Sequence, residues 1–577
     1  MVFKSLRFLR LFGELLLLIF SLCACPAREK IAIEKIVPTR MGAGIKLTRP
    51  ATVESISIRC GKRLVSQQKV DERVNTFLVD FNWEEGKSYT FNVKTHGGML
   101  SRESSPFEVP RPFELGEDRL GSPCEEVEAA KIDEWSKKLY EEVDVSARKK
   151  IGVGSFDQTV RVYDQKGRLL WKHKIPTGVV RCVKFSPTGD FLFAGEASPD
   201  GNIYSFWAAT GKLCWKYATA KDLGTSKTTY YGHQPKVCSI AIVGKRVYVG
   251  ATMTTEDYLA DGNNRKVKYW PKKGILYAFE VKTGKLLWRF PATGLLDTAP
   301  LRVSVDANGQ YLVFGGWGGS ANGRVRQRYP ENTLYLLNAA NGQLLWSYFV
   351  PPAGKYGFGS ASIGSGCNIS PNGKYVACCS MDGRLFLFDI RGCAEKKIPR
   401  LIYEKAVSMP LSVSGIPIYA YGGKVFVDDE GGVLLTIGRT YIAPAGKGLA
   451  KAPDVKHPRE NSLIKLDRDG TISWIWPARG PIETPCLSRD GRYLVVSMCH
   501  NYITRSKDMA GIYCFDLKQP GGGSKKFLWF YRMKGLGIAC GISPDGKYIG
   551  AIEGPVDIDP RDEYQRIVGE HRVYILS

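Results

Sequence analysis

The sequence predicts an all-β protein whose larger part repeats one four-stranded unit. From about residue 30 onward, short runs of apolar residues alternate with polar residues and are separated by turns. From about residue 131, an apolar strand, a glycine turn and a Trp-bearing strand recur in that order. Alternation with a period of two is typical of half-buried strands, and glycine supplies the positive φ that tight turns require. The 577 residues are enough for one large repeat domain and one small domain.

The first 25 residues have the layout of a lipoprotein-type signal peptide. A positively charged segment precedes an apolar run over 15–20, which is too short to span a bilayer. Residues 22–25, Leu-Cys-Ala-Cys, resemble a bacterial lipobox in which Cys25 is the lipidated residue. The alternative is ordinary cleavage near Ala24, which would release a soluble product. We expect export to the cell envelope and anchoring to a membrane, on its periplasmic or cell-surface side, through a lipid on Cys25.

Residues 26–112 predict a small β-sandwich domain. The segment from Trp83 to Tyr89, followed by a strand over 90–93, resembles the end of an immunoglobulin-like or fibronectin-III-like sandwich. In such a sandwich a Tyr at a strand corner bonds back to the backbone. Several prolines stand at the C-terminal end of this domain, and the acidic residues 113–130 that follow predict a linker.

The repeats predict a β-propeller over residues 131–577. The first copy runs from Thr159 to Trp171, and a second signature, Ser-Pro-Asp-Gly or a close variant, recurs between copies and is followed by an aromatic residue. Each unit therefore has four strands, a to d, with tight a–b and c–d turns. Four-stranded units at a minimum period of about 40 residues indicate a propeller. The eight copies, and thus the eight predicted blades, start at Thr159, Asn202, Ile275, Thr333, Arg384, Ser462, Gly511 and Arg572.

The last copy also predicts how the ring closes. It ends at its third strand, so the fourth must come from elsewhere in the chain. The segment 134–140, which contains Trp135, resembles the Trp-bearing d strands, and we expect it to complete the last blade. A helix over 125–142 is the competing interpretation.

Two known kinds of repeat resemble this one. The segment from Ala278 to Trp288 is similar to the repeat of quinoprotein-type (PQQ-like) propellers, and the Ser-Pro-Asp-Gly turns are more similar to WD40-type repeats. The resemblance covers roughly residues 131–577. It implies either a dehydrogenase that uses PQQ with calcium, or a cofactor-free envelope scaffold such as a propeller lipoprotein of outer-membrane barrel assembly. It also implies that five tryptophans pack between neighbouring blades: Trp171, Trp215, Trp288, Trp346 and Trp529.

The 15 cysteines show no spacing typical of zinc or haem ligands. Enzymes of the resembling family often join two adjacent cysteines above the quinone, and this chain has Cys378-Cys379. These two lie in a predicted strand, where successive side chains point to opposite faces, so we expect two small core residues. Cysteines on the innermost predicted strands could form a ring that binds a soft metal, but their unequal offsets from the following turns favour buried thiols. This second set is Cys182, Cys238, Cys367, Cys486 and Cys540.

Most long connections are expected on one face of the propeller, because they are b–c and d–a connections. They lie at about 253–273, 318–332, 438–461, 500–509 and 553–571, and at 219–235 and 350–365. Long loops on a rigid scaffold are where recognition usually occurs, and solvated loops without a ligand are the alternative. The binding candidates are Arg265, Lys266, Lys268, Tyr269, Trp270, Trp317, Arg324, Arg326, Arg328, Tyr329, Arg439, Tyr441, His233, His457 and His500.

The charge balance bears on what this face would bind. Lys and Arg outnumber Asp and Glu by 81 to 57, giving a net charge of +24, which favours anionic partners. Arg forks and aromatic planes suit phosphate, carboxylate or sugar groups. The acidic residues of 553–571 depart from this pattern and could form a counter-patch or a cation site.

These observations favour a non-catalytic envelope lipoprotein that binds an envelope protein or an anionic polymer. No cofactor, metal or catalytic residue is predicted, and nucleic acid is not expected outside the cytoplasm. The rival hypothesis is a PQQ-dependent oxidoreductase with its cofactor on the propeller axis. A third hypothesis is a hydrolase or lyase that uses the histidines and the acidic loop. The sequence makes no prediction of oligomeric state.

Overall fold

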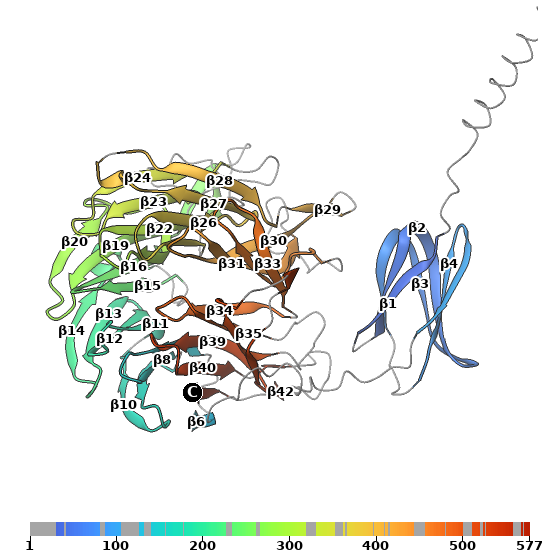
Figure 1. Cartoon of the computed structure of the whole chain (residues 1–577), viewed down its shortest axis with the longest axis horizontal. Coiled ribbons are helices and arrows are strands. Elements are labelled where there is room, and N and C mark those ends of the chain that lie inside the picture. Colours follow the sequence, from blue (N-terminus) through green and yellow to red (C-terminus); the bar gives the residue numbers. More distant parts are fainter. Residues whose placement is uncertain are drawn as a thin grey trace, which may run out of the picture. The chain divides into compact units, whose positions relative to one another are not determined.

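The chain divides into two compact units, Met1–Arg111 and Pro112–Ser577 (Figure 1). The computed structural model describes residues 31–39, 42–80, 87–104, 126–131, 140–155, 157–176, 178–226, 233–260, 266–269, 271–318, 331–351, 362–363, 366–395, 397–408, 410–413, 416–442, 456–478, 480–499, 510–519, 523–524, 527–554, 556–557, 567–568 and 571–577. Cys25, the signal peptide and Trp135 lie outside these residues. In the part of the chain described, no helix has the length and apolar character needed to cross a membrane.

The N-terminal unit is a single hydrogen-bonded sheet. The long strand β2 pairs with β3 along most of its length, with β1 through its first half and with β4 through its second half. Arg102 on β5 donates a hydrogen bond of 2.7 Å to the main-chain oxygen of Ile33 on β1. The buried side of this unit includes Ile58, Tyr89 and Phe91, and its sandwich form stays a prediction. The strands are β1 (Ile33–Thr39), β2 (Gly42–Cys60), β3 (Arg63–Asp80), β4 (Thr90–Thr95) and β5 (Gly98–Glu103).

The larger unit is a β-propeller made of four-stranded antiparallel groups, which we call blades, and this confirms the all-β class. In Figure 1 the strands β11, β15, β34 and β39 lie toward the middle, and β10, β14, β20 and β24 lie along the rim. The count of eight blades stays a prediction.

The first groups, in the order a to d, are β7 (Tyr140–Val145), β8 (Ile151–Ser155), β9 (Thr159–Tyr163) and β10 (Leu169–Lys174); β11 (Val179–Phe185), β12 (Phe191–Ala197), β13 (Asn202–Trp207) and β14 (Leu213–Ala218); β15 (Lys236–Val243), β16 (Arg246–Thr254), β19 (Lys272–Glu280) and β20 (Leu286–Phe290); and β21 (Ala299–Val305), β22 (Tyr311–Trp317), β23 (Thr333–Asn338) and β24 (Leu344–Phe349).

The later groups are β25 (Cys367–Ile369), β26 (Tyr375–Cys379), β27 (Arg384–Asp389) and β28 (Arg400–Ala406); β30 (Ile416–Val427), β31 (Val433–Ile442), β32 (Ser462–Leu466) and β33 (Ile472–Pro477); β34 (Ile482–Leu487), β35 (Tyr493–Met498), β36 (Gly511–Asp516) and β38 (Trp529–Arg532); and β39 (Leu536–Ile542), β40 (Ile549–Gly554), β43 (Arg572–Leu576) and β6 (Glu126–Lys131). Short additional elements are α2 (Ala220–Leu223), η3 (Cys393–Glu395), β29 (Leu411–Val413), β37 (Gly523–Ser524), and the hairpins β17 (Asp257–Ala260)–β18 (Lys266–Tyr269) and β41 (Val556–Asp557)–β42 (Ile567–Val568).

Four of the described a–b turns are built from the Ser-Pro-Asp-Gly signature or a close variant. The Ser543 hydroxyl accepts hydrogen bonds from the main-chain N–H groups of Lys547 (3.1 Å) and Tyr548 (2.9 Å) and donates one of 2.6 Å to Asp545. Gly546 has a φ of 74°, which favours glycine because a Cβ would be strained there. The serine hydroxyl therefore accepts hydrogen bonds from main-chain N–H groups of the turn that have no partner in the β-sheet. The turns at Ser186, Ser370 and Ser488 repeat this arrangement.

Three of the predicted tryptophans, Trp171, Trp215 and Trp288, dock onto the c–d turn of the next blade. The indole Nε1 of Trp171 donates a 3.0 Å hydrogen bond to the main-chain oxygen of Ala208, and that of Trp288 donates one of 3.2 Å to Ala339. A Cβ on Gly211 would lie 2.6 Å from the Trp171 ring, so only glycine fits beneath the indole. Trp215 repeats this contact, whereas Trp346 stacks edge-on against Phe388 at 5.0 Å, and Trp529 packs half-buried beside β39 and β40 residues.

The ring closes through an N-terminal strand, but not through the predicted residues. Strand β6 pairs antiparallel with β43, with Lys131 opposite Arg572. The last residues of the predicted linker 113–130 therefore belong to a strand, and the competing interpretation, a helix over 125–142, is wrong where β6 and β7 lie. The physical reason is that the free edge of β43 needs main-chain partners, and backbone pairing does not depend on an acidic or Trp-bearing sequence.

Candidate functional site

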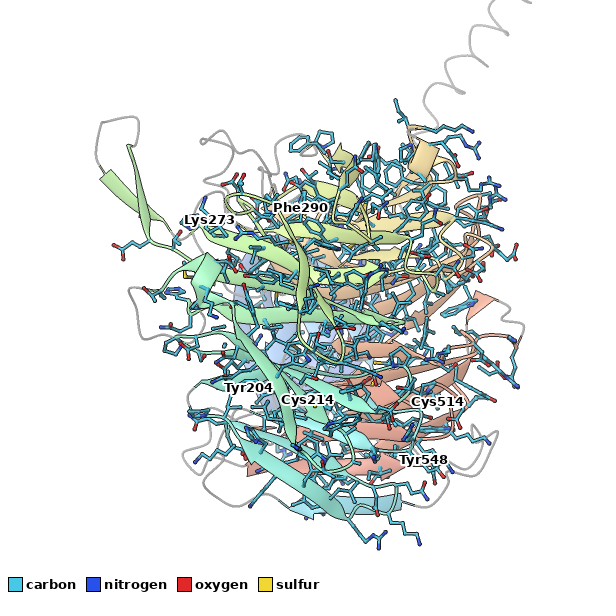
Figure 2. The ribbon with its side chains drawn as sticks, turned by 90° about the vertical axis from the view of Figure 1, so that its left-hand side faces the viewer. Tyr204, Cys214, Lys273, Phe290, Cys514 and Tyr548 are labelled. Carbon is cyan, nitrogen blue, oxygen red and sulfur yellow. The ribbon has the colours of Figure 1, made fainter. Side chains whose placement is uncertain are left out.

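The long inserts occur where the sequence analysis placed them, in b–c and d–a connections. The hairpin β17–β18, for example, is inserted between the b strand β16 and the c strand β19. Figure 2 shows this hairpin, in green, standing away from the stacked strands, with the labelled Lys273 near its base. Of the binding candidates, Arg265, Trp270, Arg324, Arg326, Arg328, Tyr329 and His500 lie outside the described residues, and Lys266, Lys268, Tyr269 and Tyr441 are described in their backbone alone.

Two binding candidates on this face lie around one lysine. The Lys272 ammonium lies 4.8 Å from the centre of the Trp317 ring and donates a hydrogen bond of 3.1 Å to the Thr254 hydroxyl. Burial lowers the pKa of Lys272, and burial together with the charges of Lys272 and Lys236 lowers the pKa of His233. The structure thus places Trp317 in a cation–π contact with Lys272 between neighbouring blades, and it places His233 where the charge of Lys272 affects it.

The other two described candidates differ in exposure. Arg439 is exposed near the end of β31. His457 is buried, with 3% of its surface exposed, and its ring Nδ1 accepts a hydrogen bond of 3.1 Å from the Arg459 main chain. The main-chain N–H of His457 donates a hydrogen bond of 2.8 Å to the Thr440 hydroxyl. His457 is therefore built into a turn and is not presented to a ligand, because a loop histidine can also satisfy local main-chain donors.

A second location was not predicted, and it lies on the propeller axis. A cavity of about 300 Å³ is lined by the last residues of the a strands β7, β11, β21, β25, β30, β34 and β39. These residues precede the tight a–b turns, so the cavity lies at the end of the strands opposite to the long inserts. Its size is at the lower end of the range for small-molecule sites.

The cavity has four charged lining residues: Asp144, Lys184, Arg302 and Lys424. The Lys184 ammonium forms an ion pair with Asp144 at 2.7 Å, and the second oxygen of Asp144 accepts a 2.8 Å hydrogen bond from the Phe185 main chain. Lys184 is 48% exposed, so water reaches this end of the axis. For Arg302 the structure records no carboxylate partner among the described residues.

The other two cationic residues of the lining, Arg302 and Lys424, lie on strands whose pairing is irregular. The pairing of β21 with β22 shifts register between Pro300 and Val303, and that of β30 with β31 shifts between Gly422 and Val425. Such irregularities bend a strand and re-aim its side chains. Arg302 and Lys424 lie inside these two irregular stretches. Gly423 is required there because a Cβ would collide with the Thr436 hydroxyl.

Three of the axial cysteines line the same cavity, although their unequal offsets suggested otherwise. The Cys486 thiol donates to the Cys540 main-chain oxygen at 3.0 Å, and the Cys540 thiol donates to that of Thr484 at 3.0 Å. The Cys367 thiol donates to the main-chain oxygen of Arg302 at 3.7 Å. A hydrogen bond with Cys540 and the charges of Lys424 and Lys184 lower the pKa of Cys486, against the effect of burial. Strand irregularities near Ile482 and Gly537 explain why counting from the turns misplaces these thiols.

Cys378 and Cys379 lie on β26 as predicted, and both are buried free thiols. Cys378 packs in a cluster with Phe386 and Ile369, whereas Cys379 packs in a different cluster with Leu385 and Leu387. Their side chains therefore point to opposite faces of the sheet. Burial raises the pKa of both thiols.

The axial cavity does not fit a quinone held by calcium. Calcium takes six to eight oxygen ligands, typically from several carboxylates. The described lining offers one carboxylate, Asp144, which already pairs with Lys184, and one aromatic side chain, Phe426. Among the described residues, no three His, Cys, Asp or Glu side chains are grouped so that they could hold a metal ion.

The sequence contained a signal for this cavity. Arg302 stands four residues before Asp306, and Lys424 stands four residues before Asp428, within the similar segments Arg-Val-Ser-Val-Asp and Lys-Val-Phe-Val-Asp. Both aspartates begin an a–b turn. An alignment of the a strands on the first residue of each a–b turn would have placed Arg302 and Lys424 at the same strand position, and therefore at one level of the propeller axis.

Comparisons with known proteins agree with the fold. Residues 156–396 match the family described as outer membrane protein assembly factor BamB. Quinoprotein glucose dehydrogenase A from Acinetobacter calcoaceticus is 25% identical over 176 residues, which cover 26% of this chain and 20% of that protein. The chain therefore matches about a fifth of the length of this curated relative.

Solved structures show the same architecture. Quinohemoprotein alcohol dehydrogenase from Comamonas testosteroni has a TM-score of 0.51 at 13% identity, covering 82% of this chain and 78% of that one. BamB from Moraxella catarrhalis has a TM-score of 0.43 at 13% identity, covering 79% of this chain and 97% of that one. At such identities the likeness concerns the fold alone. The repeats, the strand pairing, the family match and the likeness to the Comamonas testosteroni structure together identify the larger unit as a β-propeller of the PQQ-like and WD40-like type.

Proposed function

We propose that this protein is an exported, non-catalytic envelope protein whose propeller binds an envelope protein or an anionic polymer. The observation that carries the proposal is the match of residues 156–396 to a family described as an outer-membrane assembly factor. We assign the binding surface to the face formed by the b–c and d–a connections, because most of the long inserts belong to these connections, while most of the a–b and c–d turns are short.

The chemistry of that face supports an acidic partner. The insert between β22 and β23 contains Arg324, Arg326 and Arg328, and the net charge of the chain is +24. Guanidinium groups bind carboxylate and phosphate through paired hydrogen bonds. In the described part of this face, Lys272 and Trp317 would add a cation and an aromatic plane. The lipid on Cys25 would keep this face close to a membrane.

A quinone-dependent oxidoreductase is the second candidate, and the match to glucose dehydrogenase A favours it. That match covers a fifth of the relative, which is too little to carry that protein's activity over to this chain. Binding of a partner therefore has the better support.

Two matched triple variants test the proposed surface. In one, Arg324, Arg326 and Arg328 are replaced by Gln. In the other, the exposed Lys166, Lys212 and Lys282 of the c–d turns are replaced by Gln, which removes the same charge from the opposite face. Binding of polyphosphate, measured by fluorescence anisotropy in defined salt, should weaken at least tenfold in the first variant and less than threefold in the second.

A photo-crosslinking residue at Trp270 or Arg326 tests for a protein partner in cells. A discrete crosslinked species should form from these positions and not from Lys166 or Lys212. The proposal fails if both triple variants lose binding equally and no position crosslinks. Incubation with PQQ and calcium tests the rival, and uptake of one equivalent with dye reduction would overturn the non-catalytic assignment.

A further inference from the structure

Two thiols of neighbouring blades lie against each other at the axial cavity. Cys486 belongs to β34 and Cys540 to β39, and both line the cavity. The Cys486 sulfur lies 3.0 Å from the main-chain oxygen of Cys540, and the Cys540 sulfur lies 3.0 Å from that of Thr484. Each side chain therefore reaches across to the other strand. A hydrogen bond also joins the two thiols, so the sulfurs are direct neighbours.

The two thiols differ in acidity and in access to solvent. Cys486 is partly exposed, whereas Cys540 is buried, and burial raises the pKa of Cys540. The hydrogen bond with Cys540 lowers the pKa of Cys486. The charges of Lys424 and Lys184 act on Cys486 in the same direction, while burial and the charge of Asp144 oppose them. Because the thiolate is the reactive form of cysteine, Cys486 is the nucleophile of the pair.

The cavity limits which oxidant reaches this pair. Its volume is about 300 Å³, and it opens to solvent beside Lys184, whose side chain is 48% exposed. A small peroxide fits this space, whereas the active-site segment of a protein oxidant is too large for it. We therefore expect the oxidant to be a small peroxide, which converts an accessible thiolate to a sulfenic acid.

We propose that Cys486 and Cys540 form a peroxide-reactive pair that closes to a disulfide between two blades. The Cys486 thiolate attacks one oxygen of the peroxide, so that an S–O bond forms, the O–O bond breaks and hydroxide leaves. Cys540 then attacks the Cys486 sulfur, so that the S–S bond forms, the S–O bond breaks and a second hydroxide leaves. The two hydroxides take up the two thiol protons. Overall, the thiols lose two electrons and two protons, and one hydrogen peroxide becomes two water molecules.

The disulfide would join two neighbouring blades beside the closure of the ring. Strand β39 belongs to the blade that also contains the closing strands β43 and β6, and β34 belongs to the blade before it. A cross-link between residues that are distant in the sequence stabilises a fold mainly by restricting the unfolded chain. The oxidised protein therefore resists unfolding more strongly than the reduced protein does.

A second thiol pair provides an internal control. Cys367 lines the same cavity and stands opposite Cys378 in the register of β25 and β26. Burial raises the pKa of Cys367 to about 12 and raises the pKa of Cys378 as well. Both thiols therefore stay protonated, and this pair should remain reduced under the same treatment.

Treatment of the reduced, purified protein with hydrogen peroxide tests the proposal. Remaining thiols are blocked with N-ethylmaleimide in denaturant, and a tryptic digest is analysed by mass spectrometry without reduction. The tryptic peptides 480–489 and 535–547 contain one cysteine each, Cys486 and Cys540. A linked pair of these peptides should form at least tenfold faster than any oxidised product of Cys367, and dithiothreitol should reverse it. Equal oxidation of Cys367 and Cys486, or the absence of the linked pair, would overturn the proposal.

Three serine variants separate the roles of the thiols. Cys540→Ser blocks the second step, so dimedone should capture at least fivefold more sulfenic acid at Cys486 than in wild type. In Cys486→Ser, oxidation of Cys540 should slow at least tenfold. Cys367→Ser, the matched control, should form the linked pair at the wild-type rate. Fast oxidation of Cys540 in Cys486→Ser would refute Cys486 as the nucleophile.

Urea denaturation measures the effect of the bridge on the fold. Peroxide treatment should raise the urea midpoint of wild type and leave that of Cys486→Ser unchanged, and an equal shift in both would contradict an inter-blade disulfide. The peptide measurement on wild type decides the proposal even if a variant fails to fold. These results are independent of the partner-binding face, because neither cysteine lies in the long inserts.

Discussion

The indole Nε1 of Trp215 donates a hydrogen bond of 2.9 Å to the main-chain oxygen of Val281, and its ring covers Gly284 on the turn of the next blade. Gly284 has a φ of 70°, and a Cβ there would lie 2.5 Å from the ring. Gly284→Ala should therefore lower the free energy of unfolding by about 2–4 kcal/mol, because it adds backbone strain and displaces the indole. Urea denaturation followed by Trp fluorescence measures this loss.

Gly244→Ala is the matched control. Gly244 also has a positive φ, 56°, but no atom lies within 4 Å of the position a Cβ would take. The free energy of unfolding of this variant should fall only by the backbone cost of a positive φ, about 1 kcal/mol. If Gly284→Ala lost no more than Gly244→Ala, the docking of Trp215 would not contribute to stability.

The a–b turn serine makes a second prediction. Ser543→Ala removes the acceptor of two main-chain N–H groups and the donor to Asp545. The partly buried main-chain N–H of Tyr548 then loses its acceptor, which should lower the free energy of unfolding by about 1–3 kcal/mol. Ser347→Ala, at an exposed serine on β24, should stay within about 0.5 kcal/mol of wild type. A similar effect of both substitutions would contradict a stabilising role for the signature serine.

Asp389 should make the propeller sensitive to acid. Hydrogen bonds from Arg391, helped by its charge and by Arg400, lower the pKa of Asp389 to about 2. A carboxylate whose pKa is lowered by folding stabilises the protein above its unfolded value of about 3.9, and this stabilisation is lost as the pH falls toward 2.

Asp389→Asn should therefore be less stable than wild type at pH 7, and its stability should fall less between pH 4 and pH 2. Unfolding by urea at several pH values tests this, with the exposed Asp200→Asn as a charge-matched control. Parallel pH profiles for wild type and Asp389→Asn would show that the ion pair does not contribute.

The adjacent cysteines of β26 should stay reduced. Burial raises the pKa of both thiols, and their side chains enter different hydrophobic clusters. Neither Cys378 nor Cys379 should react with iodoacetamide in the folded protein, and both should react after unfolding in guanidinium. Mass spectrometry of an unreduced digest would reveal the contrary case, a peptide two hydrogens lighter that carries a Cys378–Cys379 disulfide.

Cys25 should determine how the protein is held in the envelope. Cys25→Ser removes the thiol that would carry the lipid and should move the protein from the membrane fraction to the soluble exported fraction. Metabolic labelling with a fatty-acid analogue should be lost at the same time, whereas Cys23→Ser should keep it. Unchanged fractionation of Cys25→Ser would favour ordinary cleavage near Ala24.

The repeat and turn signatures predicted the fold well because each has a local physical cause. The signature serine of an a–b turn and the tryptophan of a docking contact act through neighbouring main-chain groups, so their spacing survives in the sequence. The closing strand was misplaced because its partner lies far away in the chain, and main-chain pairing leaves little trace in side-chain pattern. The axial cavity was not predicted because Arg302 and Lys424 lie where the strand register shifts. Strict alternation of side chains does not predict the direction of a side chain at such a shift.

The pairing of β6 with β43 imposes an order on biogenesis. Strand β6 precedes every other strand of the propeller, and β43 follows all of them along the sequence. While the chain is still being made or translocated, the ring stays open and the edge of β6 has no partner. Open strand edges invite pairing with other chains, so the unfinished propeller is the species most prone to aggregate. An envelope chaperone that shields that edge until β43 emerges would limit these losses.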